Sequence, residues 1–233
     1  MSLKKSKGNM YDWVSHTHSH LIGKCPHECG YCYVQAMAKR FPEMHKRYSG
    51  DIITVDESEF SVNYGKDNLI FIEHMNDLFA DDVPSEIIMR ILSHCRKYSD
   101  SKYVLQTKNP ARYWDFKKYI PHSTTCGTTI ESNRWHTVMG KSPTPVDRAL
   151  GISRMRVSGF KTFITIEPIL DFDLNNFVNM IACVNPTFVN IGADSKGHGL
   201  NEPSYEKIMQ LYDKICKLGI EVRKKINLER LKK

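Results

Sequence analysis

The chain has 233 residues, of which 41% are hydrophobic and 25% charged, and 33 Lys and Arg against 26 Asp and Glu give a formal net charge of +7. This composition is ordinary for a globular protein, and without an apolar run of about 18 residues the sequence predicts no membrane span. The basic N-terminus lacks the apolar core of a secretory signal, and the seven cysteines are an odd number. We therefore expect a cytoplasmic protein in a reducing environment, without a disulfide framework.

Basic residues gather near both ends of the chain. They are Lys4, Lys5, Lys7, Arg223, Lys224, Lys225, Arg230, Lys232 and Lys233. Two interpretations stay open. The residues form solvated termini, or they bind a polyanionic partner, which would be a nucleic acid or an acidic electron carrier.

Short apolar segments, rich in β-branched and aromatic residues, alternate along the chain with segments of helical pattern. Segments of that length and composition are typical of buried parallel strands. We expect strands over residues 13–21, 68–73, 102–106, 124–130, 162–167, 187–192 and 219–225.

Helices are expected between these strands, and capping residues mark where they begin and end. The first has an apolar face of Val34, Met37, Ala38 and Phe41. Later helices are expected to begin at Pro84, at Asn109-Pro110, at Thr144-Pro145, after Asp173 and shortly before Ile208, with stops at Gly159 and Gly219.

This alternation implies parallel strands joined by right-handed crossovers, which fits an open doubly wound sheet or a full or partial barrel. Each of these folds places functional loops at the carboxyl ends of the strands. We expect an N-terminal tail over residues 1–11 and a single domain over residues 12–233. Residues 48–66 form the longest irregular stretch, interpreted as a lid or a surface connection.

Three cysteines stand close together between the first strand and the first helix. Cys25, Cys29 and Cys32 follow the pattern C-x3-C-x2-C, with Tyr31 just before the last. A [4Fe–4S] cluster normally takes four thiolates, so three leave one iron open to a small chelating molecule. Zinc bound by the same thiolates and His27 or His20 is the alternative, although structural zinc sites usually draw on two separated pairs.

The run from residue 16 to residue 33, HTHSHLIGKCPHECGYCY, resembles the cluster loop of the radical S-adenosyl-L-methionine (SAM) superfamily. Within the superfamily it resembles a phage-associated and bacterial branch that is distantly similar to spore photoproduct lyase. The similarity continues through residues 74–79, 166–168 and 222–228, so that it covers most of the chain.

The resemblance implies a partial (β/α)6 barrel with a [4Fe–4S] cluster on Cys25, Cys29 and Cys32 and SAM on the open iron. The reduced cluster of such an enzyme cleaves SAM to a 5′-deoxyadenosyl radical, which removes hydrogen from a substrate. A flavodoxin- or ferredoxin-type electron donor is implied as a partner. Tyr31 matches the aromatic position that packs against adenine, and Tyr33 lies where the main chain meets the adenine edge.

Further candidates for binding SAM come from positions at or near the strand ends. His74 and Asn76 offer neutral acceptors for the amino group of SAM, although Asn76 equally fits a helix cap. Glu131 would suit the ribose hydroxyls, and Arg154 or Lys108 the carboxylate. The cavity-lining candidates also include Thr128 and Glu167.

His16, His18 and His20 alternate and would share one face of a strand, as a metal-binding ladder or as a solvated or cavity-lining face. The substrate of the expected enzyme is unidentified, with a nucleic acid or nucleotide favoured by the basic charge. The alternative function is a non-catalytic nucleic-acid-binding module that carries zinc or a cluster.

Overall fold

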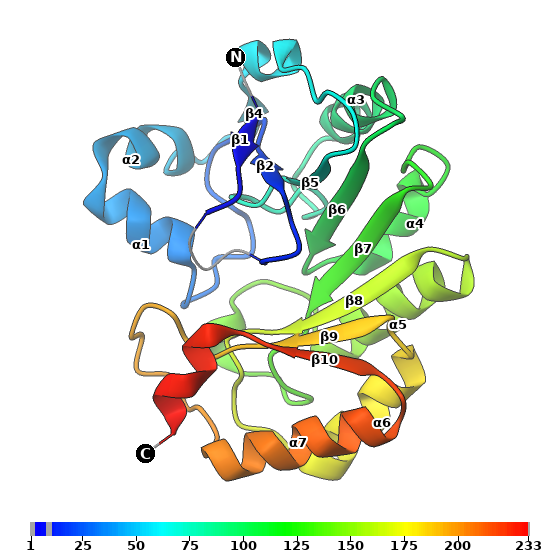
Figure 1. Ribbon diagram of the computed structural model, residues 1–233. Coiled ribbons are helices and arrows are strands. Elements are labelled where there is room, and N and C mark those ends of the chain that lie inside the picture. The colour runs from blue at the N-terminus through cyan, green and yellow to red at the C-terminus, as the bar shows by residue number, and fades with distance from the viewer. Residues whose placement is uncertain (1–2, 8–10, 233) are drawn as a thin grey trace.

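The computed structural model describes residues 3–7 and 11–232, and its main sheet has eight strands in the order β1-β2-β5-β6-β7-β8-β9-β10 (Figure 1). The first strand is antiparallel to β2, and β2 and the six strands that follow it in the sheet run parallel. The strands are β1 (Lys4–Lys5), β2 (His16–His18), β5 (Leu69–Ile72), β6 (Lys102–Thr107), β7 (Thr124–Thr129), β8 (Lys161–Ile166), β9 (Phe188–Ile191) and β10 (Glu221–Lys224). A separate antiparallel pair joins β3 (Leu21–Ile22) to β4 (Thr54–Val55).

Helices α3 to α7 lie along the outside of the curved sheet, whereas α1 and α2 lie beside the carboxyl ends of its strands (Figure 1). The helices are α1 (Tyr33–Arg40), α2 (Pro42–Tyr48), α3 (Ser85–Arg96), α4 (Tyr113–Phe116), α5 (Pro145–Val157), α6 (Leu174–Val184) and α7 (Tyr205–Lys217). Four 3₁₀ turns, η1 (Glu57–Ser61), η2 (Pro110–Arg112), η3 (Thr137–Met139) and η4 (Ile226–Leu231), complete the assigned helical elements of the described residues. In this part of the chain no helix has the length and apolarity needed to cross a membrane.

Local sequence explains the helix ends. The side chain of Thr144 accepts a hydrogen bond from the Asp147 N–H, and Pro145 occupies the first turn of α5. Helix α6 ends at Asn185, which has a left-handed φ of 48°. The apolar stripe of α3, which includes Ile88, Ile91 and Leu92, packs into the core between the helices and the sheet.

The inside of the curved sheet holds a second, aromatic core. Tyr11, Phe71, Phe163 and Phe188 pack there, with the rings of Phe163 and Phe188 stacked 5.2 Å apart. Gly127 in β7 faces the same space, because a Cβ on it would lie 2.1 Å from the Phe163 ring. The interior of the sheet is therefore filled at its base, and open space remains toward the carboxyl ends of the strands.

The predicted fold class is confirmed, since each expected strand is present in a mostly parallel sheet of partial-barrel type. The first expected strand is divided into β2 and β3, and β10 is the strand expected over residues 219–225, one parallel strand more than the six of a (β/α)6 barrel. Residues 48–66 are neither unstructured nor a free lid, because they contain β4 and η1 and bury Val62 and Tyr64 in the core. The division into a tail and one domain stays a prediction, although β1 and buried Tyr11 both belong to the packed structure.

Candidate functional site

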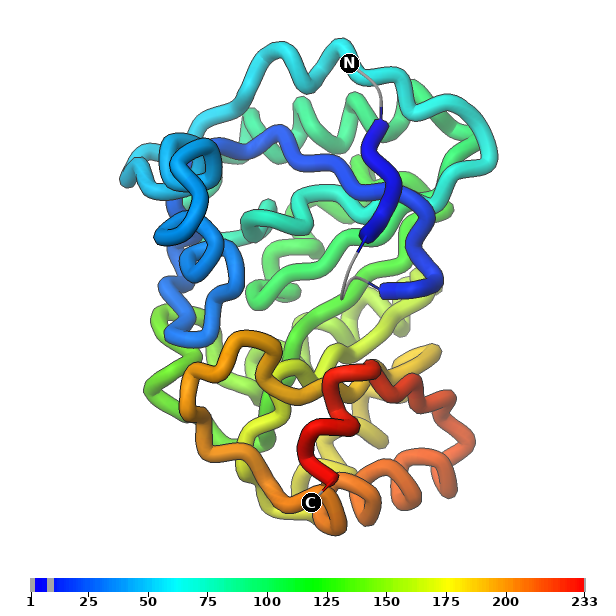
Figure 2. Tube along the Cα trace, turned by 60° about the vertical axis from the view of Figure 1, so that its left-hand side comes forward, coloured from blue at the N-terminus to red at the C-terminus, as the bar shows by residue number. Residues whose placement is uncertain are grey.

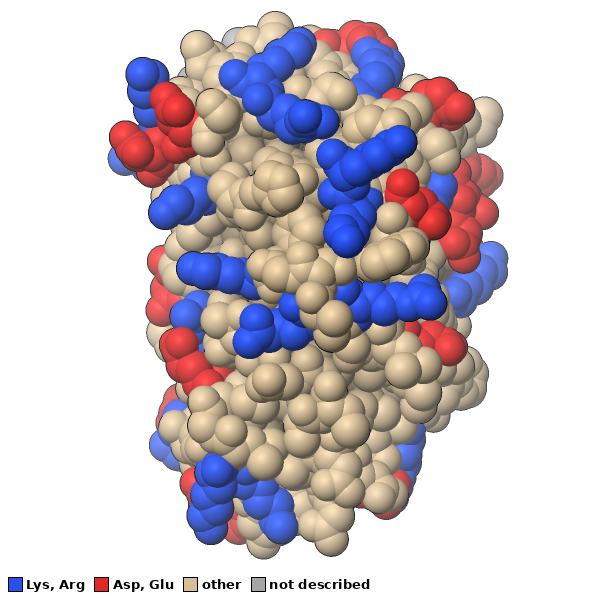
Figure 3. Space-filling model, turned by 90° about the vertical axis from the view of Figure 1, so that its right-hand side faces the viewer, with Lys and Arg blue, Asp and Glu red and all other residues tan. Residues whose placement is uncertain are grey.

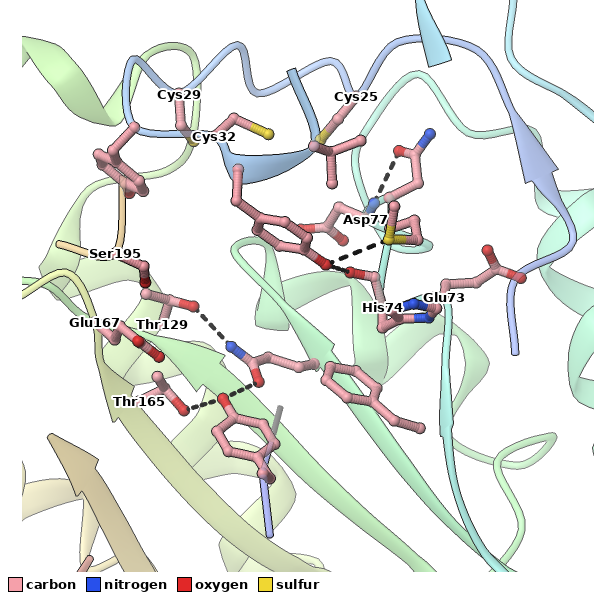
Figure 4. Close-up of a pocket in the computed structure, with 18 of the residues that line it drawn as sticks. Cys25, Cys29, Cys32, Glu73, His74, Asp77, Thr129, Thr165, Glu167 and Ser195 are labelled. Atoms are coloured by element: carbon pink, nitrogen blue, oxygen red, sulfur yellow. Dashed lines mark hydrogen bonds between the residues drawn. The ribbon is translucent and has the colours of Figure 1, made fainter. Parts of the chain in front are cut away.

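A cavity of about 970 Å³ lies at the carboxyl ends of the parallel strands. All three clustered cysteines line it, together with side chains from the ends of β5, β6, β7, β8 and β9 (Figure 4). Its volume is at the upper end of the range for small-molecule sites in proteins. The position is the one in which parallel α/β folds place their functional groups.

The cysteine loop connects β3 to α1 through short turns. The Cys29 carbonyl accepts from the Cys32 N–H at 3.1 Å, and Glu28 takes a left-handed φ of 50°. Cys25, Cys29 and Cys32 are partly buried free thiols, and Figure 4 shows them together along one wall of the cavity. The loop therefore presents all three sulfurs to the same space.

A second segment, residues 138–141, is hydrogen-bonded to the cysteine loop and is here called the strap. The Gly30 N–H donates to the Val138 carbonyl at 2.8 Å, and the Lys141 N–H donates to the His27 carbonyl at 2.7 Å. The Cys29 thiol contacts the Met139 carbonyl at 3.4 Å. Gly140 makes this approach possible, because it has a φ of +65° and a Cβ there would lie 2.1 Å from the His27 carbonyl oxygen.

A buried carboxylate ties the cysteine loop to the sheet. Asp77 Oδ2 lies 2.8 Å from His27 Nε2, and the same oxygen accepts from the Lys108 N–H at 2.7 Å. The Thr107 hydroxyl donates to Asp77 Oδ1 at 2.6 Å. Burial alone would raise the pKa of Asp77, but His27 and these hydrogen bonds hold it below the ordinary value.

The thiols fit an iron–sulfur cluster in both place and chemistry. Burial, followed by the Asp77 carboxylate, raises the pKa of Cys25, and burial also raises the pKa of Cys29. Cationic iron would offset this by stabilising the thiolates. The described residues contain no group of three or more His, Cys, Asp or Glu that could hold a metal ion. A cluster has a different requirement, since its thiolates bind different irons and need not converge on a single ion.

Tyr31 lines the cavity within a buried charged network. Its hydroxyl donates to Glu131, and the Lys108 ammonium lies 5.3 Å from the centre of its ring. Glu131 forms a fully buried ion pair with Arg148 at 2.7 Å and lies 3.5 Å from Lys108 Nζ. Burial alone would raise the pKa of Glu131, but Arg148 and Lys108 hold it below the ordinary value.

Of the predicted SAM-binding residues, Tyr33, His74, Asn76 and Glu167 line the cavity as Tyr31 does. The Tyr33 hydroxyl donates to the His74 carbonyl at 2.5 Å, which fixes the Tyr33 ring. The Asn76 amide donates to the Gly23 carbonyl at 2.9 Å. Burial lowers the pKa of His74 to about 4, so its imidazole is neutral at pH 7.

Glu167 stands at the end of β8. Its carboxylate accepts from Lys225 Nζ at 2.7 Å and from Asn227 Nδ2 at 2.8 Å. This pairing fastens the C-terminal segment to the wall of the cavity.

Three other predicted residues do not line the cavity: Thr128, Glu131 and Arg154. Thr128 is buried, and its hydroxyl donates to the Thr107 carbonyl at 2.7 Å. Glu131 faces Arg148 behind the cavity wall. Arg154 lies on α5 with its guanidinium 5.9 Å from the Trp114 ring centre.

The alternating histidines do not form a solvated or cavity-lining face. His18 and His20 are buried with their rings 4.4 Å apart, and each has a carboxylate partner, Glu59 and Glu73 respectively. His16 is bonded to the neighbouring Ser15 hydroxyl. The interpretation as an exposed row is therefore wrong for His18 and His20.

Sequence reasoning missed two features of the site. Asp77 is a hub that could have been sought at the end of the second strand, next to His74 and Asn76. Lysines of the N-terminal segment line the cavity because β1 pairs with β2, and Lys196 lines it from the loop after β9. A two-residue edge strand made of lysines has no periodic sequence pattern from which it could be predicted.

Comparison with known proteins agrees with the fold. A spore photoproduct lyase structure with bound AdoMet and dinucleoside spore photoproduct gives a TM-score of 0.59 at 11% identity, over 93% of this chain and 66% of that one. The structure of Streptococcus suis SuiB bound to S-adenosylmethionine gives a TM-score of 0.58 at 8% identity, over 93% of this chain and 52% of that one. The chain thus spans slightly less than two thirds of the former and about half of the latter, and both have the radical SAM fold.

No protein among the curated proteins matches the sequence. A family model described as "Protein of unknown function (DUF5131)" matches residues 9–218. Because this match covers most of the chain, the protein belongs to that family.

Proposed function

We propose that the protein is a radical SAM enzyme. The observation that carries the proposal is the presentation of Cys25, Cys29 and Cys32 to one cavity at the carboxyl ends of a partial barrel. Three thiols and no fourth on the loop would leave one iron of a [4Fe–4S] cluster open to SAM. When bound, cluster and cofactor would supply an electron and the 5′-deoxyadenosyl radical.

The chain's own residues would bind and orient the cofactor. Tyr31 offers an aromatic face and Tyr33 its main chain near the cysteines, and His74, Asn76 and Glu167 offer polar groups on the same wall. Lys108 replaces Arg154 as the cation for the SAM carboxylate, because Lys108 lines the cavity. Glu131 is a positioning residue in this proposal, since it holds both Tyr31 and Lys108 from behind.

The recessed position of the cysteine loop in the cavity would serve hydrogen abstraction, because a radical must be kept from water and from other donors. A flavodoxin- or ferredoxin-type protein in a reducing cytoplasm is the proposed electron donor. A nucleic acid or nucleotide is the proposed substrate. Support comes from the basic charge and from the lyase structure complexed with a dinucleoside, whereas SuiB is seen with a precursor peptide.

The test begins with anaerobic reconstitution with iron and sulfide, followed by dithionite and SAM, and measures 5′-deoxyadenosine by chromatography. We expect product from the wild type and a loss of at least about 100-fold in each of Cys25→Ala, Cys29→Ala and Cys32→Ala. Cys183→Ala is the matched control, because Cys183 is an exposed thiol outside the cavity. A colourless protein with one zinc per chain and no 5′-deoxyadenosine would contradict the proposal and support a non-catalytic nucleic-acid-binding module that carries zinc.

A further inference from the structure

The mouth of the cavity carries a group of lysines, here called the rim lysines: Lys4, Lys5, Lys7 and Lys196. All four are exposed. Three come from the N-terminal segment, which lies in front of the sheet, and the fourth from the loop after β9 (Figure 2). Segments from opposite ends of the chain thus bring positive charge to one opening.

The charge at this opening is not neutralised from within the protein. Among the described residues, no carboxylate lies within 4.0 Å of a rim ammonium group. The carboxylates that line the cavity are each hydrogen-bonded elsewhere in the protein; they are Glu73, Asp77, Glu167 and Asp194. The described lining as a whole holds six lysines and four carboxylates, so its formal charge is positive, and a cavity wall of low dielectric focuses the field of these charges.

Charge alone does not distinguish the rim, since Lys and Arg also lie over the face at the amino ends of the strands (Figure 3). That face has a local explanation. Helices α3, α5 and α7 all end there, and their last turns carry basic residues that favour the helix C-termini. The rim lysines lie on an edge strand and on loops, so no helix terminus accounts for them.

Aromatic side chains continue inward from the rim. Tyr11, Tyr33, Phe71 and His74 line the same cavity, and the Tyr33 ring is fixed by its hydrogen bond to the His74 carbonyl. Lys4 is close enough to lower the pKa of His74, after the larger effect of burial. Cations outside and aromatic faces inside form the arrangement with which proteins hold phosphates and stack an unpaired base.

We propose that the rim lysines bind the phosphates of a nucleotide unit whose base enters the cavity, with Tyr33 and Phe71 as its stacking surfaces. This inference rests on the proposed function, because it names the substrate of the same site. A base can enter such a recess only when it is single-stranded or turned out of a duplex. The ligand is thus an unpaired nucleic-acid strand, or a free nucleotide with the same phosphate chemistry.

The test measures binding, so that it does not depend on the radical chemistry. A fluorescein-labelled oligothymidine 12-mer is titrated with cluster-free protein at several salt concentrations, and fluorescence anisotropy is read. For wild type we expect binding that weakens steeply with salt. In Lys4→Glu/Lys5→Glu the affinity falls at least 10-fold, and the salt slope falls by about 1.4 because each lost contact removes about 0.7 for a single strand.

The control is Lys214→Glu/Lys217→Glu, which makes the same change of net charge on exposed residues of α7 outside the cavity. It should change affinity by less than threefold. Lys196→Glu, on a different segment, is expected to weaken binding by three- to tenfold. Circular dichroism melting establishes that each variant is folded.

Competition with deoxynucleoside monophosphates and with a duplex of the same length identifies the source of the phosphate. Displacement by monophosphates at equal phosphate concentration supports a free nucleotide, and resistance to them supports a strand. Equal losses in the rim and control variants, or no binding at low salt, would overturn the inference. Either result could stand beside normal 5′-deoxyadenosine formation, so this failure differs from failure of the proposed function.

Discussion

His27 and Asp77 meet at 2.8 Å across fifty positions of the sequence, and their contact joins the cysteine loop to the ends of β5 and β6. The imidazole lies between two of the cysteines in sequence, so its position fixes the loop on both sides. Metal sites depend on such outer contacts to orient their ligands. The pair supports the fold, and we expect it to support the proposed cluster as well.

Asp77→Asn tests this support. In the variant an amide nitrogen replaces one of the two carboxylate oxygens. It would face either the Lys108 N–H and His27 or the Thr107 hydroxyl, so at least one buried donor loses its acceptor. We expect the free energy of unfolding to fall by about 1–3 kcal/mol and iron per chain to fall after reconstitution. Asp81→Asn, an exposed site nearby, is the control for urea unfolding and iron analysis. Equal stability and iron content in the two variants would contradict the role of Asp77.

Gly140→Ala tests the strap over the cysteine loop. Its Cβ would lie 2.1 Å from the His27 carbonyl oxygen in a backbone conformation that favours glycine, so the strap or the loop must move. A loss of about 1–3 kcal/mol in the free energy of unfolding is expected from such overpacking, together with lower iron retention. The control is Gly50→Ala, where a Cβ meets nothing within 4 Å. Should both variants unfold at the same urea concentration and retain equal iron, the strap is dispensable.

Much of the fold could be predicted from sequence, because apolar periodicity and capping residues act locally. The cysteine loop could be predicted for the same reason, as its three thiols lie within the eight residues from Cys25 to Cys32. The direction of a side chain beyond a strand end is set by its neighbours. Glu131 follows β7, as predicted, yet it turns toward Arg148, a residue on α5 whose burial no local pattern reveals.

The strand in the N-terminal segment also depends on a tertiary contact that the local sequence does not reveal. Lys4 and Lys5 have no strand pattern of their own, and they become a strand only because β2 offers an unpaired edge. Pairing of this kind is a tertiary event. The predicted tail therefore carried no sign that its lysines would reach the cavity mouth.

Stability is expected to fall in mild acid, and His94 should contribute to the fall. Burial lowers the pKa of this histidine to about 4, so the folded state binds fewer protons than the unfolded state between about pH 4 and 6.5. The free energy of unfolding therefore rises with pH across that window. The contribution of His94 to stability is lost as the pH falls from about 6.5 to about 4. The neighbouring His18 shifts in the same direction, chiefly through burial.

His94→Gln removes this titration while its amide can still donate to the Val62 carbonyl, the partner of His94 Nε2. Urea unfolding at pH 4.5, 5.5, 6.5 and 7.5 measures the slope. We expect it to decrease by up to about 1.4 kcal/mol per pH unit, the value for one proton. His122→Gln, at a histidine outside this buried cluster, should leave the slope unchanged. A variant slope equal to that of wild type would show that His94 does not titrate in this range.

The Glu131–Arg148 pair gives the sharpest test of how the cavity wall is built. Both side chains are fully buried and lie 2.7 Å apart, so removing one leaves an uncompensated charge. Glu131→Gln and Arg148→Met should each lower the free energy of unfolding by about 3–5 kcal/mol, whereas the double variant should lose less than the sum. Urea unfolding of the four proteins measures the coupling.

Because Glu131 also holds Tyr31 and Lys108, SAM binding should weaken in Glu131→Gln even when the protein is folded. Additive losses, or unchanged SAM affinity, would mean that the pair neither stabilises the wall nor positions the residues in front of it.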